Sequence, residues 1–327
     1  MSLRTFPAWK LPDNGAELTE ASAHLQAADG SIVPVTNGIP RFVASEQYTA
    51  GFGLQWNRFS RTQLDSVSGV PLSRDRLRRC VGEETWGRLH EIVALECGCG
   101  AGRFTEVLLE CGASVMSVDL STAVDANVRN FAITESHRVA QADIMSLPFA
   151  ARSFGVVICL GVIQHTPDPE AAIQALWNHV EPGGVLVIDH YERGHAGWWH
   201  STKPLVRAWL RGREPAHAMR VTNALVDFFF PLHNAVKGVY ALWFALCRVS
   251  PITTYLRTYP ALRPEAQREW AYLDTHDSLT DYFKHERSRE QIRSCLADLG
   301  GENIWCVDGG NGVEARATRP VRVSLAP

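Results

Sequence analysis

Apolar and polar positions alternate in a regular plan through the middle of the chain, from Ile92 to about Tyr191. Helix-like amphipathic segments, such as 102–111 and 169–180, separate short apolar runs. The apolar, strand-like runs are residues 92–96, 114–119, 138–143, 155–160 and 185–189. Strands that alternate with helices are typical of βαβ units and of a parallel sheet with helices on both faces. The pattern therefore predicts a Rossmann-like, doubly wound α/β sheet that is mostly parallel.

The C-terminal part returns to this plan. A helix-like segment at residues 288–300 precedes two strand-like runs at 303–308 and 312–317. Two late strands that rejoin the sheet would complete it with an antiparallel edge.

The flanks of this core are less regular. Up to about Arg88 the chain is irregular, apart from a small hairpin predicted at 29–42 and a helix predicted at 52–65. From about residue 198 to residue 262 the chain is aromatic, apolar and basic. Five prolines are expected to break this stretch into short helices: Pro204, Pro215, Pro231, Pro251 and Pro260.

Composition narrows the function classes. Hydrophobic residues make up 46% of the 327 residues, charged residues 20%, and the net charge is -3. This balance is typical of a soluble globular protein and lacks the basic footprint of nucleic-acid binding. The N-terminus has no signal-peptide pattern, and the eight cysteines are scattered. We therefore expect free thiols in a reducing cytoplasm, and no metal ligands.

A glycine-rich loop follows the first core strand, in 93-VALECGCGAGRF-104. A strand, a glycine loop and a helix make a nucleotide pocket at the carboxyl end of the strand. The spacing is G-x-G-x-G rather than the dinucleotide pattern G-x-G-x-x-G, and Glu96 stands just ahead of it. A carboxylate repels a pyrophosphate but suits an ammonium group. S-adenosylmethionine has an amino-acid tail, a sulfonium and no phosphates.

Acids also end the next two strands. Asp119 follows Glu96 by about twenty residues, where a carboxylate can accept both ribose hydroxyls. Asp143 can accept from the adenine amino group, with Ile144 against the ring. The fourth strand ends in 159-CLGVIQHTPDP-169, and 181-EPGG-184 is a turn before the fifth.

These landmarks, in this order, resemble the class I S-adenosylmethionine-dependent methyltransferases over about residues 93–191. One departure is Gly155, where many relatives have Asp at the start of the fourth strand. The resemblance implies S-adenosylmethionine as cofactor and S-adenosylhomocysteine as product. The implied cofactor contacts are Gln55, Trp56, Glu96, Gly98, Cys99, Gly100, Gly102, Asp119, Leu120, Asp143, Ile144, Leu160 and Gln164.

The flanks carry weaker resemblances. Residues 29–42 resemble the small Trm112-like module without its zinc-binding cysteines. Residues 52–65, 272–283 and 309–317 resemble bacterial methyltransferases of secondary-metabolite and surface-sugar clusters, which implies a small-molecule acceptor. Gln55, Trp56 and Tyr48 then belong to a segment that covers the cofactor.

Catalytic candidates follow the fourth and fifth strands. His165 lies beside the expected methyl group and can take a proton from a hydroxyl, although it can equally orient its loop. His190 and Tyr191 are both expected to face the pocket, as base or substrate contact. His276 clusters with Asp277, Tyr282 and His285 near the C-terminal part, and a His-Asp pair can act as a base.

Four parts are expected. Residues 1–88 hold the small β element and cofactor-covering helices, and residues 89–192 hold the cofactor-binding core. Residues 193–287 form a helical insertion or substrate lid, and residues 288–327 complete the sheet. The apolar stretch 223–249 is interrupted by charged residues and proline, so it is no convincing membrane span. It can serve as a lid, a homodimer face or a surface helix pair on a membrane.

The expected reaction is in-line methyl transfer to oxygen, nitrogen or carbon of a small molecule. Aminocarboxypropyl transfer would use the same cofactor pocket, and a non-catalytic protein would bind the cofactor without turnover. A nicotinamide oxidoreductase would share the fold, but Glu96 and the loop spacing argue against it.

Overall fold

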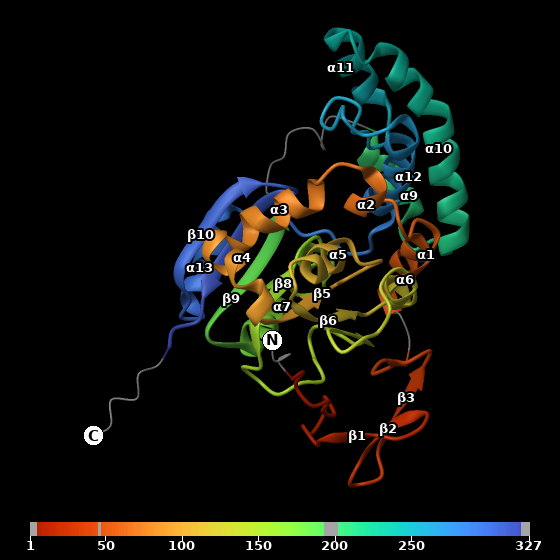
Figure 1. Cartoon of the computed structure of the whole chain (residues 1–327). Helices are drawn as coiled ribbons and strands as arrows, with labels where there is room; N and C mark the ends of the chain where they lie inside the picture. The colour runs from red at the N-terminus through yellow and green to blue at the C-terminus, as the bar shows by residue number, and fades with distance from the viewer. Residues whose placement is uncertain (1–4, 45–46, 193–201, 322–327) are drawn as a thin grey trace.

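A seven-stranded mixed sheet forms the centre of the molecule (Figure 1). The computed structural model describes residues 5–44, 47–192 and 202–321. The strand order is β10-β11-β9-β8-β5-β6-β7. The strands are β5 (Val93–Cys97), β6 (Ser114–Asp119), β7 (His137–Gln141), β8 (Phe154–Cys159), β9 (Val180–Tyr191), β10 (Glu302–Gly309) and β11 (Gly312–Thr318). Strands β5 to β9 are parallel to one another, while β11 is antiparallel to both β9 and β10. The predicted α/β sheet with an antiparallel edge is confirmed.

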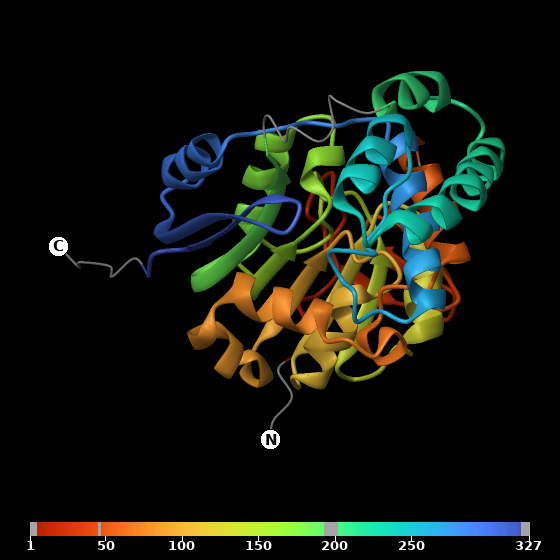
Figure 2. The same cartoon turned by 90° about the horizontal axis from the view of Figure 1, so that it is seen from above.

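Helices cover both faces of this sheet (Figure 2). Alternate residues of each strand point to one face or the other. On one face, α3 (Leu72–Val81) and α5 (Arg103–Glu110) pack against residues such as Ala94. On the other face, α7 (Pro169–His179) and α13 (Arg289–Asp298) pack against residues such as Leu95. Because both faces are buried, the parallel strands are apolar almost throughout.

Local signals place the helix starts. Asp168 caps α7 by accepting a hydrogen bond from Ala171 N at 3.0 Å, with Pro169 in the first turn. Ser288 and Gln291 form a capping box at the start of α13.

The connection between β6 and β7 contains α6 (Ala123–Asn130).

The N-terminal part forms a second, smaller sheet. Its order is β1 (Leu18–Glu20), β2 (His24–Ala27), β3 (Ile32–Thr36) and β4 (Ile39–Pro40), all antiparallel. The hairpin predicted at 29–42 is therefore the second half of a four-stranded element. Phe42 N donates to Gln141 O at 2.8 Å, so this sheet is tied to the β7 edge of the main sheet.

Between the two sheets the chain is more helical than predicted. It forms η1 (Gln47–Thr49), α1 (Ala50–Arg58), α2 (Asp65–Ser68), α3, α4 (Glu83–Gly87) and η2 (Leu89–Glu91). The helix predicted at 52–65 ends at Arg58. The expectation of an irregular chain up to Arg88 was wrong for α3, whose buried Leu77, Cys80 and Val81 recur at helical spacing between charged residues.

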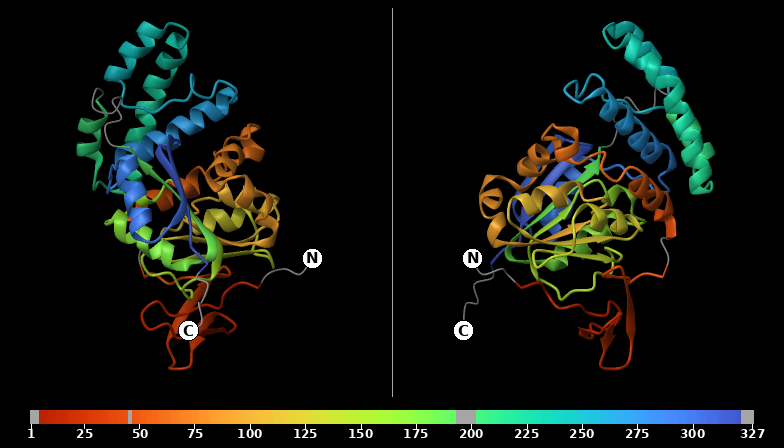
Figure 3. Two further views of the ribbon diagram at one scale, coloured as in Figure 1. Left: turned by 90° about the vertical axis from the view of Figure 1, so that its left-hand side faces the viewer. Right: turned by 45° about the vertical axis from the view of Figure 1, so that its right-hand side comes forward.

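The insertion contains α9 (Lys203–Leu210), α10 (Pro215–Val236), α11 (Tyr240–Val249) and α12 (Pro264–Thr280). Its expected start, near residue 198, lies outside the described residues. Pro231 does not break α10, so that part of the prediction was wrong. Asp227 and Pro231 are both exposed, so water can bind the carbonyl that loses its helical partner. Figure 3 shows the small N-terminal sheet (red) and the α10–α11 hairpin (green to cyan) at opposite ends of the molecule.

Candidate active site

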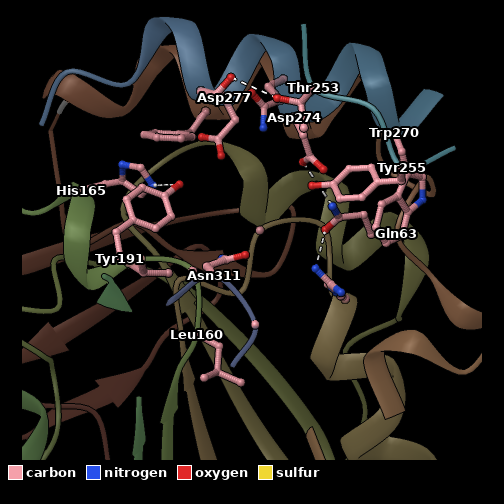
Figure 4. A pocket seen from close by; sticks show the side chains of 18 of the residues that line it. Gln63, Leu160, His165, Tyr191, Thr253, Tyr255, Trp270, Asp274, Asp277 and Asn311 are labelled. Atoms are coloured by element: carbon pink, nitrogen blue, oxygen red, sulfur yellow. Dashed lines mark hydrogen bonds between the residues drawn. The ribbon is translucent and has the colours of Figure 1, made fainter. Parts of the chain in front are cut away.

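A cavity of about 1230 Å³ lies at the carboxyl edge of the parallel strands, beneath α12 (Figure 4), and residues of α11 also line it. Its floor consists of the loops after β5, β6, β7 and β8. Its walls come from α1, the end of β9, and the insertion. Pockets for single drug-sized ligands span roughly 300–1,000 Å³. The cavity therefore has room for a nucleoside-sized molecule and a second ligand.

The glycine loop presents bare backbone to this cavity. Gly98 and Gly100 have φ of 72° and 51°, in the left-handed region that favours glycine. A Cβ on Gly98 would lie 2.2 Å from Val162 Cγ2, and one on Gly100 would lie 3.2 Å from the Trp56 ring. The loop is held by Val118 O, which accepts from the backbone N of Gly98 and of Cys99 at 2.7 and 3.0 Å. Side chains at these two glycines would therefore clash with Val162 and crowd Trp56, which both line the cavity.

Gly102 has a different role in the same loop. It lies outside the cavity lining, has φ of 100° and precedes the first turn of α5. A Cβ there would lie 2.6 Å from the Phe131 ring. Its glycine is thus explained by helix packing rather than by a ligand.

The two strand-end acids lie where the sequence placed them, on the cavity wall. Asp119 Oδ2 accepts from Gly100 N at 2.9 Å, so this carboxylate also shapes the glycine loop. Asp143 Oδ1 accepts from Met145 N at 2.9 Å. Burial, with the nearby Asp143 and Asp119 carboxylates, raises the pKa of Tyr48 to about 12. The Tyr48 hydroxyl therefore stays protonated and can donate into the cavity.

Apolar and amide groups complete this side of the cavity. Leu120, Ile144 and Leu160 supply apolar wall, and Trp56 reaches in from α1. Gln55 is 2% exposed, and its Oε1 has no hydrogen-bond partner among the described residues. A buried acceptor without a partner is costly, so Gln55 Oε1 is available to a ligand donor.

Glu96 does not line the cavity, contrary to the expectation that it meets the ligand. Its carboxylate is buried on the α5 side of the sheet. There it accepts from Thr105 Oγ1 at 2.5 Å and from Ser117 Oγ at 3.2 Å. Burial raises the pKa of Glu96 to about 7. This acid holds α5 against β5 and β6 beneath the glycine loop.

Three further candidates also lie away from the cavity lining. The buried Gln164 sits in η3 (Ile163–His165), and its side-chain amide has no partner among the described residues. His190 lies between Asp189 and Tyr191 on β9, so it points to the opposite face of the sheet. His276 faces α10, where its Nδ1 lies 3.2 Å from Thr222 Oγ1, and burial lowers its pKa to about 4.

His165 and Tyr191 do meet at the cavity, as Figure 4 shows. Tyr191 Oη lies 3.4 Å from His165 Nε2. His165 Nδ1 lies 3.1 Å from Phe283 O and 3.4 Å from Asp281 Oδ2. Both neighbours of Nδ1 are acceptors, so Nδ1 carries the proton and Nε2 keeps its lone pair. This is the geometry of a positioned general base.

Asp281 holds this histidine through a buried ion network. Arg207 Nε lies 2.6 Å from Asp281 Oδ1, and Lys284 Nζ lies 3.5 Å from Oδ2. The Asp281 side chain is fully buried. Its contacts come from α9 and from the segment after α12, so the insertion fixes the orientation of His165.

Sequence reasoning missed Asp274 of α12 and named Asp277 only as a partner of His276. Asp274 and Asp277 point from this helix into the cavity (Figure 4). Burial raises the pKa of Asp274 to about 7 and also raises the pKa of Asp277. Asp277 Oδ1 has no hydrogen-bond partner among the described residues. Their spacing of three residues, which places them on one helix face, was the signal available in the sequence.

Cationic groups lie close to these acids, and they too were missed. Lys203 Nζ donates to Thr253 Oγ1 at 2.8 Å, and burial lowers the pKa of Lys203 to about 8. Arg103 Nη1 donates to Gln63 Oε1 at 3.1 Å, and the Arg103 guanidinium lies over the Trp270 ring at 5.6 Å. The upper cavity therefore combines carboxyl, ammonium and aromatic groups.

A second buried ion network supports the other wall. Arg76 of α3 lies 2.5 Å from Asp189 Oδ2 and 3.0 Å from Glu314 Oε1. Asp189 Oδ1 also accepts from Gly161 N at 2.5 Å. Through Arg76, Asp189 thus connects α3 and β11 to the loop after β8.

Comparisons with known proteins agree with this geometry over the core. Residues 95–188 match the family model described as Methyltransferase domain. The ubiquinone biosynthesis O-methyltransferase of Leptothrix cholodnii is 30% identical over 121 residues, which are 34% of this chain and 49% of that protein. The enzyme of the same name from Pseudomonas fluorescens is 33% identical over 102 residues, 30% of this chain and 44% of that protein. The chain thus spans less than half the length of these curated relatives.

Among solved structures, magnesium protoporphyrin IX methyltransferase from Synechocystis PCC 6803 has a TM-score of 0.45 and 15% identity, over 84% of this chain and 97% of that chain. The cavity itself fits S-adenosylmethionine. Gly98 and Gly100 present backbone to it, Asp119 and Asp143 line it, and Gln55 Oε1 needs a donor. Residues 95–188 are a methyltransferase domain of the class that uses S-adenosylmethionine.

Proposed function

We propose that the protein is an S-adenosylmethionine-dependent methyltransferase that transfers a methyl group to a hydroxyl of a small molecule. One observation carries this proposal. The bare glycine backbone and the two strand-end acids open into the same cavity as His165, and that cavity is larger than one nucleoside needs. Cofactor and acceptor can therefore lie side by side beneath the insertion.

The cofactor side has residues for the nucleoside part of the ligand. Asp119 is placed to accept from the ribose hydroxyls, and Asp143 to accept from the adenine amino group, with Ile144 against the ring. Gln55 and Trp56 close the space above the glycine loop. When bound, the cofactor supplies a methyl group activated by its sulfonium and leaves as S-adenosylhomocysteine.

The acceptor side supports proton transfer. His165 Nε2 takes the proton of the acceptor hydroxyl, while Phe283 O and Asp281 hold Nδ1–H on the other side of the ring. Tyr191 lies beside Nε2, and burial keeps its pKa well above the ordinary value, so its hydroxyl stays a donor. A base of this kind is needed for oxygen more than for nitrogen or carbon nucleophiles. The names of the two relatives, both O-methyltransferases, support the same choice.

The α12 acids are proposed acceptor contacts. Asp277 Oδ1 lacks a partner among the described residues, and Asp274 keeps its proton up to about neutral pH. Together they can both donate to and accept from a polyhydroxylated acceptor of the secondary-metabolite or sugar type.

Calorimetric titration with S-adenosylmethionine and S-adenosylhomocysteine tests the cofactor half. Asp119→Ala should raise both dissociation constants by about 10- to 100-fold, because hydrogen bonds to a charged group are lost. Asp119→Asn checks that the loop survives, since Asn can still accept from Gly100 N. Asp308→Ala is the control, because that acid is on the outer strand β10 and outside the cavity lining. Binding of a nicotinamide cofactor instead of either ligand would overturn the proposal.

Mass spectrometry of acceptor screens tests the reaction. Addition of one methyl group to an oxygen, with S-adenosylhomocysteine as the second product, is the expected result. Addition of an aminocarboxypropyl group would mean that the enzyme uses the same cofactor but transfers a different group. Tight cofactor binding without turnover on any acceptor class would favour a non-catalytic binding protein.

A further inference from the structure

The α10–α11 hairpin carries half of the large apolar side chains that are exposed in the described residues. Fourteen large apolar side chains are exposed in the described part of the chain, and seven of these lie within residues 228–249. They are Phe228, Leu232, Val239, Tyr240, Leu242, Phe244 and Val249. Single exposed apolar residues are normal, but a contiguous group of this kind marks an interaction surface.

The end of this hairpin and the segment that follows it are basic. Residues 228–264 contain Lys237, Arg248, Arg257 and Arg263 and no Asp or Glu, although Asp227 of α10 directly precedes them and the whole chain has a net charge of -3. The Arg257 guanidinium lies 5.5 Å from the Tyr240 ring centre and 5.2 Å from that of Trp243. Aromatic and aliphatic side chains bordered by cations match the interface of a bilayer with anionic headgroups.

The position and exposure of the hairpin suit contact with a flat surface. It lies at the end of the molecule opposite the small N-terminal sheet (Figures 1 and 3). Every residue of α11 is at least partly exposed. In the described ranges, no helix is both long enough and apolar enough to cross a membrane. Contact would therefore be with the surface of the bilayer.

The hairpin also borders the active-site cavity. Tyr240, Trp243 and Phe244 of α11 line the cavity, and Tyr240 and Phe244 are exposed as well, at 62% and 44%. One short helix thus joins the outer apolar surface to the inside of the cavity. A molecule with an apolar chain could pass along α11 without leaving apolar surroundings.

We propose that the α10–α11 hairpin docks on the surface of an anionic membrane and gives the cavity access to an acceptor carried by a lipid. A second copy of the chain fits this surface less well. A two-fold dimer would bring Lys237 and Arg257 of each copy near the same cations of the other, and like charges repel. The docking itself does not depend on the proposed methyl transfer.

Vesicle flotation tests the docking with two lipid compositions. One set of vesicles contains phosphatidylcholine with phosphatidylglycerol, and the other contains phosphatidylcholine alone. The full-length protein should float with the first and bind the second at least about tenfold more weakly, and the difference should shrink at high salt. No flotation with anionic vesicles, or equal binding to both, would overturn the proposal.

Two matched double variants locate the contact. Phe228→Ser with Leu242→Ser should weaken binding to anionic vesicles by at least about tenfold, because both side chains are exposed and neither lines the cavity. Ile32→Ser with Val321→Ser removes equally exposed apolar groups elsewhere and should change nothing. Unchanged binding by the first variant would reject the hairpin as the contact.

Two further measurements separate membrane docking from a change in cofactor binding and from dimer formation. Calorimetry with S-adenosylhomocysteine should give the same affinity for all variants, which shows that the fold is intact and keeps the cofactor question apart. Light scattering should show a monomer. A dimer that Phe228→Ser with Leu242→Ser dissociates would assign the surface to a second copy and overturn the membrane proposal.

Discussion

The two sides of the cavity are built in different ways. On the cofactor side, apart from Gln55 and Trp56 of α1, the groups come from loops within residues 98–160. They are held by nearby backbone, as when Gly100 N donates to Asp119 across 19 residues. On the acceptor side, His165 is positioned by Phe283 across 118 residues, and Asp281 by Arg207 across 74. The cofactor side thus depends on local geometry, whereas the acceptor side depends on how the insertion packs.

Each side also has a buried acid with a raised pKa, but the two acids have different surroundings. Burial raises the pKa of both Glu96 and Asp274 to about 7. Glu96 is enclosed between α5 and the sheet, where Thr105 and Ser117 donate to it. Asp274 faces the cavity, so a bound acceptor would contact Asp274 and leave Glu96 untouched. If the two sides are independent, substitutions should affect cofactor affinity or turnover, and seldom both.

The largest expected effect is on turnover. His165→Ala should lower kcat by about 10²- to 10⁴-fold, because it removes the proposed base, while cofactor affinity stays within about twofold. His190→Ala is the control, since His190 is a buried histidine that points to the other face of the sheet. Steady-state kinetics with an acceptor found by mass screening give the result. Equal losses in both variants would mean that His165 acts only on structure.

The next effect is on cofactor affinity. Gly98→Ala should weaken S-adenosylhomocysteine binding by about 100-fold or more, because its Cβ would lie 2.2 Å from Val162 Cγ2. Gly161→Ala is a matched control: its φ is also positive, at 81°, but nothing lies within 4 Å of its Cβ. Both variants strain the backbone, but only Gly98→Ala adds the clash. Calorimetric affinities of the two variants therefore isolate the effect of the clash. Equal affinities for the two variants would show that the bare backbone at Gly98 is not required.

The smallest effect is the pH dependence of stability. The folded-state pKa of Glu96 and Asp274, about 7, exceeds the unfolded values of 4.5 and 3.8. The native state therefore binds these protons more tightly. Their stabilising effect is complete below the unfolded pKa values and is lost as pH rises through about 7.

Glu96→Gln and Asp274→Asn should each raise Tm at pH 8 by about 2–4 °C and change it little at pH 4. Thermal unfolding followed by circular dichroism measures this. Addition of an acceptor should alter the pH dependence that Asp274 contributes, but not that of Glu96. A drop in Tm at pH 8 that disappears at pH 4 would instead mean that the carboxylates are stabilising as charged groups.

The sequence by itself determined the sheet and predicted which loops line the cavity beside the glycine loop, although Glu96, Gly102 and Gln164 lie away from it. The alternation of strands and helices gave the sheet and its antiparallel edge, and the loop glycines with Asp119 and Asp143 marked where a ligand would lie. These features could be predicted because strand period, glycine conformation and the shared carboxyl edge of parallel strands are local or topological properties. Successive side chains of a strand point to opposite faces, so His190 and Tyr191 of β9 cannot both face the pocket, as we had expected.

Only the tertiary structure decided the rest. Glu96 turned toward α5 because its side chain follows the pleat of β5, not the loop that it precedes. His276 faces α10, while Asp274 and Asp277 on the same helix face the cavity. Arg76 meets Glu314 across 238 residues. These placements depend on which helix faces pack together, and contacts between residues so distant in the chain leave no periodic signal in one sequence.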